Sequence, residues 1–113
     1  MNEALHKDDG KPEIHYILAM PGIKDVAMVG TFGRKKYGQW NYRAGMPWMK
    51  LCGSIARHLT DFIIGHDIDV ESGLPTLAHL VYDGLMLLGY QYEHKGYDDR
   101  YKVPKSPTDS LSF

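Results

Sequence analysis

The sequence predicts an all-α protein, a small helical bundle built around a central antiparallel helical hairpin. Apolar residues recur at steps of three and four along three separate segments, which is the spacing of one face of an α-helix. Proline and glycine residues separate these segments, at the places where helices begin and end. The chain has 113 residues, which is enough for one domain but too few for two independent cores.

The first helix is predicted over residues 22–36. Pro21 precedes it, the apolar positions inside it have helical spacing, and Gly38 follows its basic C-terminal turn. Residues 1–20 are predicted to be a polar N-terminal arm, within which the apolar stretch 14–20 can form a helical turn or a short strand.

The second and third helices form the predicted hairpin. The second, over residues 47–65, has the clearest amphipathic pattern and is closed by Gly65. The third, over residues 75–90, is apolar on most sides, which predicts that it is the central helix. A linker of about ten residues joins them, so they should run antiparallel. Residues 21–90 thus form the helical domain, and residues 91–113 form a polar C-terminal tail with tyrosines and prolines.

Composition and charge exclude several classes of protein. The formal charge is −1, so we expect no general nucleic-acid binding. A single cysteine, Cys52, excludes an intramolecular disulfide, and its apolar helical surroundings favour a buried, inert thiol. No apolar run approaches the roughly 18 residues that a membrane span needs, so we expect no membrane partner and a cytoplasmic location.

Histidine and aspartate side chains should gather within the hairpin. His58 and Asp83 lie at similar heights, about 10 Å from the connecting loop at 1.5 Å per residue, and Asp61 and His79 lie level one turn nearer to it. Imidazole and carboxylate groups together suit a divalent metal or acid–base chemistry. The alternative interpretation is that both histidines are core residues with satisfied hydrogen bonds and that Asp61 is solvated.

The linker between these helices is acidic. Asp67, Asp69 and Glu71 alternate along it like the ligands of a cation loop, although it lacks the glycine and the distal glutamate of a calcium-binding EF-hand. An equally good explanation is that Asp69 or Ser72 caps the third helix.

A cationic and aromatic run follows the first helix and provides groups suited to a nucleotide. Cations can bind phosphates, Tyr37 or Trp40 can stack on a base, and the amide of Asn41 can bind a base edge or a sugar. Arg57 adds a second cation beside His58. The alternative interpretation of the cationic and aromatic run is a solvated helix end with aromatic packing. The nucleotide-binding candidates of the run are Lys35, Lys36, Tyr37, Asn41 and Arg43.

Five motifs in order resemble one protein family, the dATP/dGTP diphosphohydrolase N-terminal domain found in many bacteriophage proteins. They lie in residues 7–12, 32–45, 57–59, 65–74 and 77–79. The first motif includes Lys11, which the resemblance adds to the substrate-binding residues.

The resemblance implies a fold related to the MazG and HisE nucleotide pyrophosphatases, which work as multimers with Mg²⁺ (or Mn²⁺). It implies hydrolysis of a purine deoxynucleoside triphosphate to the monophosphate and pyrophosphate, in the host cytoplasm if a phage encodes the chain. The alternative is a non-catalytic nucleotide-binding protein, a sponge or a sensor. The chain has four glutamates and no Glu-x-x-Glu motif, so metal ligands should come largely from histidine and aspartate. The expected catalytic residues are His58, Glu71 and His79, and the expected metal ligands are Asp69, Glu71, His79 and Asp83.

Self-association is the last expectation. A helix that is apolar nearly all round needs neighbours on every side, and three helices supply few, so we expect a homo-oligomer, a dimer or larger. The competing account is that residues 14–20 and the tyrosines of the tail cover the third helix within one chain.

Overall fold

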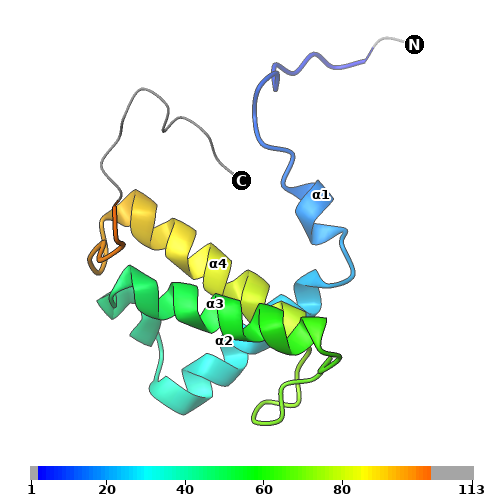
Figure 1. The fold of residues 1–113 in the computed structure, drawn as a ribbon. Helices are drawn as coiled ribbons and strands as arrows, with labels where there is room; N and C mark the ends of the chain where they lie inside the picture. Colours follow the sequence, from blue (N-terminus) through cyan, green and yellow to red (C-terminus); the bar gives the residue numbers. More distant parts are fainter. Residues whose placement is uncertain (1–2, 103–113) are drawn as a thin grey trace, which may run out of the picture.

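The computed structural model describes residues 3–102, which form helices joined by loops and turns (Figure 1). Within residues 3–102 there is no β-strand, so the predicted all-α fold is confirmed. None of the helices in this part of the chain is long and apolar enough to cross a lipid bilayer. In chain order the elements are α1 (His15–Leu18), α2 (Ile23–Tyr37), the 3₁₀-helix η1 (Asn41–Ala44), α3 (Trp48–Ile63) and α4 (Thr76–Glu93).

Proline and glycine set most of the helix boundaries. Pro47 and Pro75 precede α3 and α4, each with φ −56° and ψ 134°, where the missing N–H of proline costs no hydrogen bond. Gly38, with φ 100°, ends α2. α4 extends three residues beyond its predicted end at residue 90, because no helix breaker occurs at 91–93; it ends at Glu93 and is followed by His94, whose φ is 55°. The tail therefore begins after Glu93, and its part over residues 103–113 lies outside the described residues.

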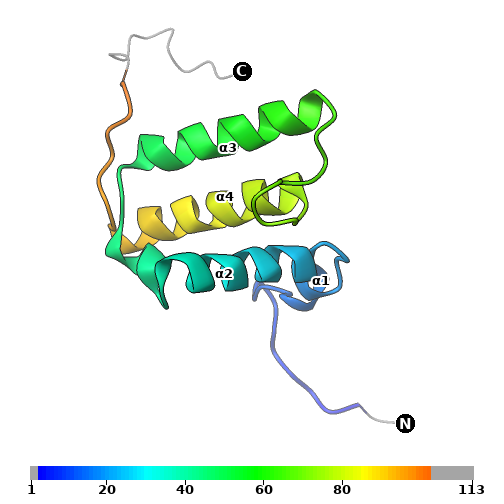
Figure 2. The same cartoon turned by 90° about the horizontal axis from the view of Figure 1, so that it is seen from below.

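The predicted hairpin is present. α3 and α4 lie side by side and run antiparallel, and α4 lies between α3 and α2 (Figure 2). α4 is therefore the central helix, as its apolar sequence predicts. The buried apolar side chains within the described residues are Val29 of α2, Leu51 of α3, and Ala78 and Tyr90 of α4.

The N-terminal arm extends away from the three long helices (Figure 1). The apolar stretch 14–20 contains the short helix α1 rather than a strand, and every residue from 3 to 20 is exposed. The arm therefore adds little buried surface to the body of the protein.

The loop between α3 and α4 is closed by hydrogen bonds at the first turn of α4. Thr76 is only 2% exposed, and its Oγ1 donates to the carbonyl oxygen of His66 at 2.9 Å. The N–H of Thr76 donates to the carbonyl oxygen of Asp67, and the N–H of Asp69 donates to that of Leu74. These bonds fix the acidic loop beside the start of α4.

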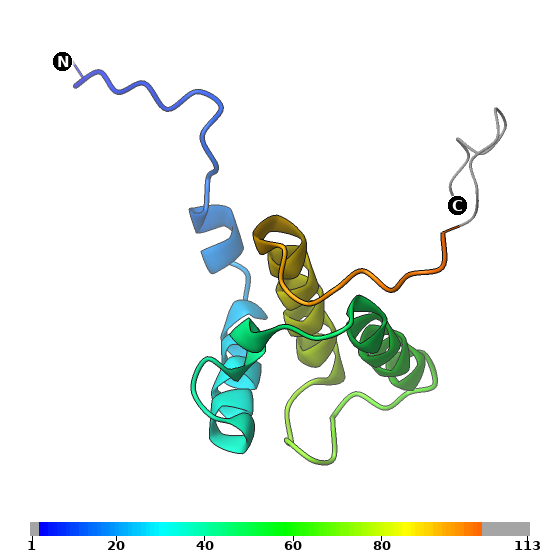
Figure 3. The same ribbon diagram turned by 90° about the vertical axis from the view of Figure 1, so that its left-hand side faces the viewer.

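After α4 the chain returns to the start of α3 (Figure 3). The N–H of Trp48 donates to the carbonyl oxygen of Tyr97 at 3.0 Å, and the N–H of Met49 donates to Oδ1 of Asp99 at 2.9 Å. Asp99 supplies the side-chain cap that Pro47 cannot provide. The crossing requires glycine at position 96, because φ there is 64° and a Cβ would overlap the carbonyl oxygen of Met46.

Asp99→Ala should lower the free energy of unfolding by about 1 kcal/mol, because it removes the acceptor for an N–H at the start of α3. Chemical denaturation measures the change. Asp9→Ala, in the exposed arm, is the control and should unfold like the parent protein. Equal stability of the Asp99 variant and the parent would mean that the tail does not cap α3 in solution.

Candidate functional site

A cavity of about 960 Å³ lies among α2, α3, α4 and the two loops that border them. This is within the range of pockets that hold nucleotide-sized ligands. Basic and aromatic side chains of α2 and of the loop after it line one part, and histidine and aspartate side chains of the hairpin line another. Of the predicted site residues, those lining the cavity are Lys36, Tyr37, Asn41, Arg57, His58, Asp69, Glu71, His79 and Asp83.

Two histidines from neighbouring helices form the middle of the polar part. The rings of His58 on α3 and His79 on α4 stack with centroids 5.1 Å apart. Nε2 of His58 lies 3.8 Å from Oδ2 of Asp83, and Ser54 donates a hydrogen bond of 2.6 Å to the same oxygen. Ser54 precedes His58 by one helical turn, so it presents its hydroxyl on the same face of α3.

The acidic loop contributes the rest of the cluster. Ser72 donates two hydrogen bonds to Oδ2 of Asp69, from its N–H at 2.9 Å and from its hydroxyl at 2.8 Å. The same hydroxyl oxygen lies 2.7 Å from Nε2 of His79. Because an ionised carboxylate only accepts, the hydroxyl proton of Ser72 points to Asp69, and Nε2 of His79 is the donor to Ser72. In the neutral ring Nδ1 is then the nitrogen without a proton.

Burial and local charges set the protonation of these groups. Burial lowers the pKa of His79 below 6.5, and this effect outweighs the opposite effect of the facing Asp69 carboxylate. Burial alone would raise the pKa of Asp69, but the two hydrogen bonds from Ser72 together with the nearby His79 and His58 outweigh it, and the pKa is lowered. Near neutral pH the site therefore holds a neutral imidazole beside an ionised carboxylate.

The predicted convergence of Asp61 with the cluster is wrong. Asp61 is exposed and does not line the cavity. Three residues along an α-helix leave side chains about 60° apart around the axis, and this angle turns Asp61 away while His58 faces α4. Asp67 is also exposed, and it contributes its carbonyl oxygen to the start of α4.

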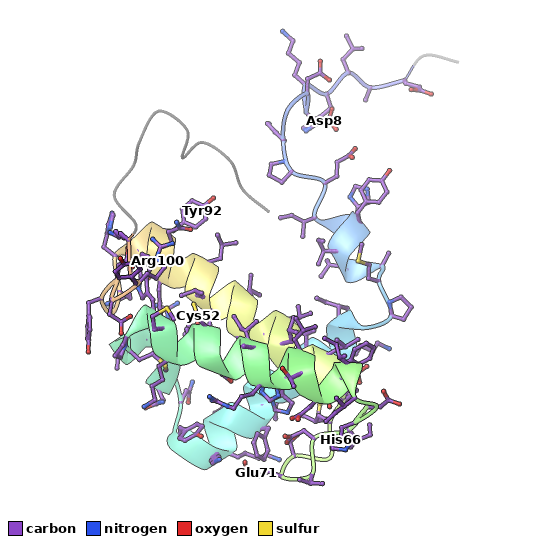
Figure 4. All side chains as sticks on the ribbon, in the orientation of Figure 1. Asp8, Cys52, His66, Glu71, Tyr92 and Arg100 are labelled. Carbon is purple, nitrogen blue, oxygen red and sulfur yellow. The ribbon has the colours of Figure 1, made fainter. Side chains whose placement is uncertain are left out.

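The cation next to the loop is already paired. Nζ of Lys36 forms a hydrogen-bonded ion pair with Glu71 and lies 5.0 Å from the centre of the Tyr37 ring. The bond to Glu71 is the largest cause of the raised pKa of Lys36. Figure 4 shows Glu71 on the loop near the end of α2. A predicted phosphate-binding residue and a predicted metal ligand thus neutralise each other.

Three predicted substrate-binding residues do not line this cavity. Lys11 lies in the exposed arm, where its N–H donates to the carbonyl oxygen of Asp8, a residue labelled in Figure 4. Lys35 is exposed on α2. Arg43 stacks on the ring of Trp40 at 5.0 Å and lines a smaller neighbouring cavity of about 240 Å³.

Sequence reasoning did not single out several residues that line the cavity or support it. Ser54 has a detectable signal, because it lies one helical turn before His58. Ser72 was considered only as a helix cap, and its contact with His79 depends on the path of the loop. Lining residues that were not singled out include Arg34, Lys50 and Tyr82.

A resident metal site does not fit the residues that the structure describes. Within residues 3–102 no three histidine, cysteine, aspartate or glutamate side chains form a group that can hold a metal ion. The cluster instead contains two separate pairs, His58 with Asp83 and His79 with Asp69. Mg²⁺ commonly takes only one or two protein carboxylates and completes its shell with substrate phosphates and water.

Comparison with known proteins gives one match. Residues 1–100 match the family model described as dATP/dGTP diphosphohydrolase, N-terminal. Neither the curated proteins nor the solved structures contain a match.

The free energy of unfolding should fall as the pH is lowered from about 7.5 to about 5.5. The unfolded chain protonates His79 near pH 6.5, whereas the folded chain does so only at lower pH. The stabilisation from the neutral ring is complete above pH 6.5 and is lost as the pH falls from there towards the folded-state pKa.

Denaturant titrations across this pH range test the effect. His79→Gln should show a shallower dependence than the parent, and His6→Gln, in the exposed arm, should keep the parental dependence. The same slope in the parent and in His79→Gln would show that His79 is not held neutral by burial.

Proposed function

The chain belongs to the dATP/dGTP diphosphohydrolase N-terminal family, and from that premise we propose that its cavity binds a purine deoxynucleoside triphosphate and hydrolyses it. The products are the monophosphate and pyrophosphate, and Mg²⁺ (or Mn²⁺) enters with the phosphates as part of the substrate. One observation carries the proposal: a single cavity brings cationic side chains of α2 and α3 together with the His58–His79 cluster. Cations neutralise phosphate charge, and the cluster provides acid–base groups.

In the proposed hydrolysis each polar group of the cavity has a role. Lys36 and Arg57 bind phosphate oxygens, and Asp69 and Asp83 are available to the metal that accompanies the phosphates. The oxygen of a water molecule bonds to the α-phosphorus. The bond from that phosphorus to the oxygen bridging the α- and β-phosphates breaks, and this oxygen leaves with pyrophosphate. Nδ1 of His79 accepts the proton of the water, because the ring is neutral and its Nε2 is engaged with Ser72.

A second candidate is a nucleotide-binding protein without catalysis, a sponge or a sensor. Two observations favour it: no group of three metal-binding side chains lies within residues 3–102, and Glu71 is paired with Lys36. Both candidates use the same cavity and differ in whether the nucleotide is changed.

Incubation with a panel of nucleotides and Mg²⁺ or Mn²⁺ separates the two. The proposal expects dATP or dGTP to give monophosphate and pyrophosphate, as read by chromatography. His79→Gln should lower the rate by about a hundredfold, the size of a lost acid–base group, without a comparable loss of binding. Tight binding with the nucleotide recovered unchanged would favour the sponge, and no turnover of any nucleotide would refute the hydrolase.

Two adjacent lysines offer a matched test of phosphate binding. Lys36→Met should weaken the binding of a dNTP about tenfold, because it removes a charge-assisted hydrogen bond from the cavity. Lys35→Met removes the same charge from the same helix but outside the cavity, and should leave affinity unchanged. Calorimetry measures both. Equal losses in the two variants would indicate only a general effect of charge.

We also propose that the protein self-associates through the face of α4 opposite the cavity. Leu77, Val81, Leu85 and Leu88 recur there at steps of three and four and are exposed. The residues expected to cover them, 14–20 and the tyrosines after position 91, are themselves exposed where the structure describes them. A second copy of the same stripe is the simplest cover for an apolar face of this kind.

Light scattering after size exclusion tests this proposal. The parent should have at least twice the chain mass of 12.8 kDa, and Val81→Glu should shift the population towards that single-chain mass. Val70→Glu, which adds the same charge at an exposed loop position, should not. A parent protein that is monomeric at micromolar concentration would disprove the self-association.

A further inference from the structure

Trp40 has an unusual environment for a tryptophan. It lies between α2 and η1, lines the cavity, and is nevertheless 58% exposed. Its backbone is left-handed, with φ 62° and ψ 16°, a conformation that bulky residues rarely adopt. With more than half of its surface exposed, the side chain is not part of the buried core. A residue held in this way is a reason to look for a function.

Hydrogen bonds on both sides hold the backbone at this position. The N–H of Asn41 donates to the carbonyl oxygen of Gly38, and the N–H of Arg43 donates to that of Trp40 at 3.0 Å. The turn closes at Gly45, whose N–H donates to the carbonyl oxygen of Tyr42. The direction in which the indole projects is thus fixed by the turn.

The indole also contacts two neighbouring side chains while more than half of its surface stays exposed. The guanidinium of Arg43 lies 5.0 Å from its ring, and the ring of Tyr42 is tilted against it at 6.3 Å. These contacts orient the ring, and the large exposed fraction shows that much of its surface stays available. An oriented aromatic surface with little left to lose in conformational freedom is well suited to stacking.

The other aromatic candidate, Tyr37, is less suitable. The ammonium group of Lys36 lies 5.0 Å from the centre of its ring, and Lys36 is tied to Glu71. A base could stack on that side of Tyr37 only after this ion pair had moved. Trp40 also has a cation over its ring, the guanidinium of Arg43, but among the described residues this cation is not held in an ion pair. Asn41, the next residue, also lines the cavity.

We infer that Trp40 is the surface on which the purine ring of the nucleotide stacks, with the phosphates directed along the same cavity towards Lys36, Arg57 and the histidine pair. This inference rests on the proposed nucleotide binding and adds the base-binding residue and its selectivity. A two-ring purine overlaps an indole more fully than a one-ring pyrimidine, so the stack favours purine nucleotides.

The probes are α,β-methylene dATP, which cannot be cleaved to pyrophosphate, its dCTP counterpart, and inorganic tripolyphosphate. The parent should bind the purine probe more tightly than the pyrimidine probe. Trp40→Leu should weaken binding of the purine probe by about tenfold or more, the usual effect of losing one stacked aromatic ring, and should leave binding of tripolyphosphate unchanged. Trp40→Phe should restore most of the lost affinity.

Folding and stacking are separated by a second variant and a spectroscopic signal. Trp40→Gly relieves the left-handed strain, so it should unfold no more readily than Trp40→Leu and still lose the purine preference. In Trp48→Phe, Trp40 is the sole tryptophan, because the chain has two. The purine probe should quench the fluorescence of that variant.

The outcomes distinguish this inference from the proposed function. Purine binding that is equal in the parent, Trp40→Leu and Trp40→Gly would overturn the role of Trp40 and leave nucleotide binding intact. A parent that binds tripolyphosphate and both nucleotides equally would also overturn it. A parent that binds none of the three probes would overturn both the proposed function and this inference.

Discussion

The packing of α4 between α2 and α3 is the constraint on which the cavity depends. α4 supplies His79 and Asp83, and its two neighbours supply the facing walls. Both ends of α4 are fixed by buried hydroxyl groups. Thr76 donates to the carbonyl oxygen of His66 at the start, and Tyr90 donates to that of Tyr42 near the end. Each acceptor belongs to a loop that borders the cavity, so α4 cannot rotate without disturbing the walls on both sides.

The polar cluster is compatible with this packing because each of its carboxylates has a hydroxyl partner. Ser54 donates to Asp83 and Ser72 donates to Asp69. Within the described residues, no buried side-chain nitrogen or oxygen lacks a hydrogen-bond partner. An unpaired polar group next to an apolar helix interface would destabilise the fold by about a few kcal/mol. The hydrogen bonds from the two serines remove this penalty for the two carboxylates. The two serines hold the carboxylates in position, and their placement indicates that the fold of the hairpin maintains the cluster.

The helices were predictable because their signals are local. Each signal acts over one or two helical turns: the three-and-four spacing of apolar residues and the breakers Pro47, Pro75 and Gly38. The observed bounds of α2, α3 and α4 agree with the predicted bounds to within three residues. The pairing of His58 with Asp83 was predictable for the same reason, since equal distance from a hairpin loop places residues at equal height. Asp61 was misplaced because height along a helix does not give the direction around it.

The remaining features depend on chain paths that periodicity does not describe. The contact of Ser72 with His79 follows from the closure of the loop, and the cap of α3 by Asp99 joins residues fifty positions apart. The placement of Arg43 on Trp40 follows from one left-handed residue in the turn. No pattern in the sequence predicts a left-handed backbone at a tryptophan, since glycine or asparagine usually adopts that conformation.

The charges around the cavity are arranged in pairs, and this arrangement bears on how a nucleotide can enter. Lys36 pairs with Glu71, while Asp69 and Asp83 face His79 and His58. A triphosphate that binds Lys36 would bring its negative charge next to the Glu71 carboxylate, and the two would repel each other unless a cation accompanies the phosphates. Under the proposed function, Mg²⁺ bound to the nucleotide would meet this requirement, since it would neutralise the carboxylate of Glu71 and the phosphates together. Under the proposed function, the Lys36–Glu71 pair would therefore favour the metal–nucleotide complex over the bare nucleotide, even though the described residues form no metal site of their own.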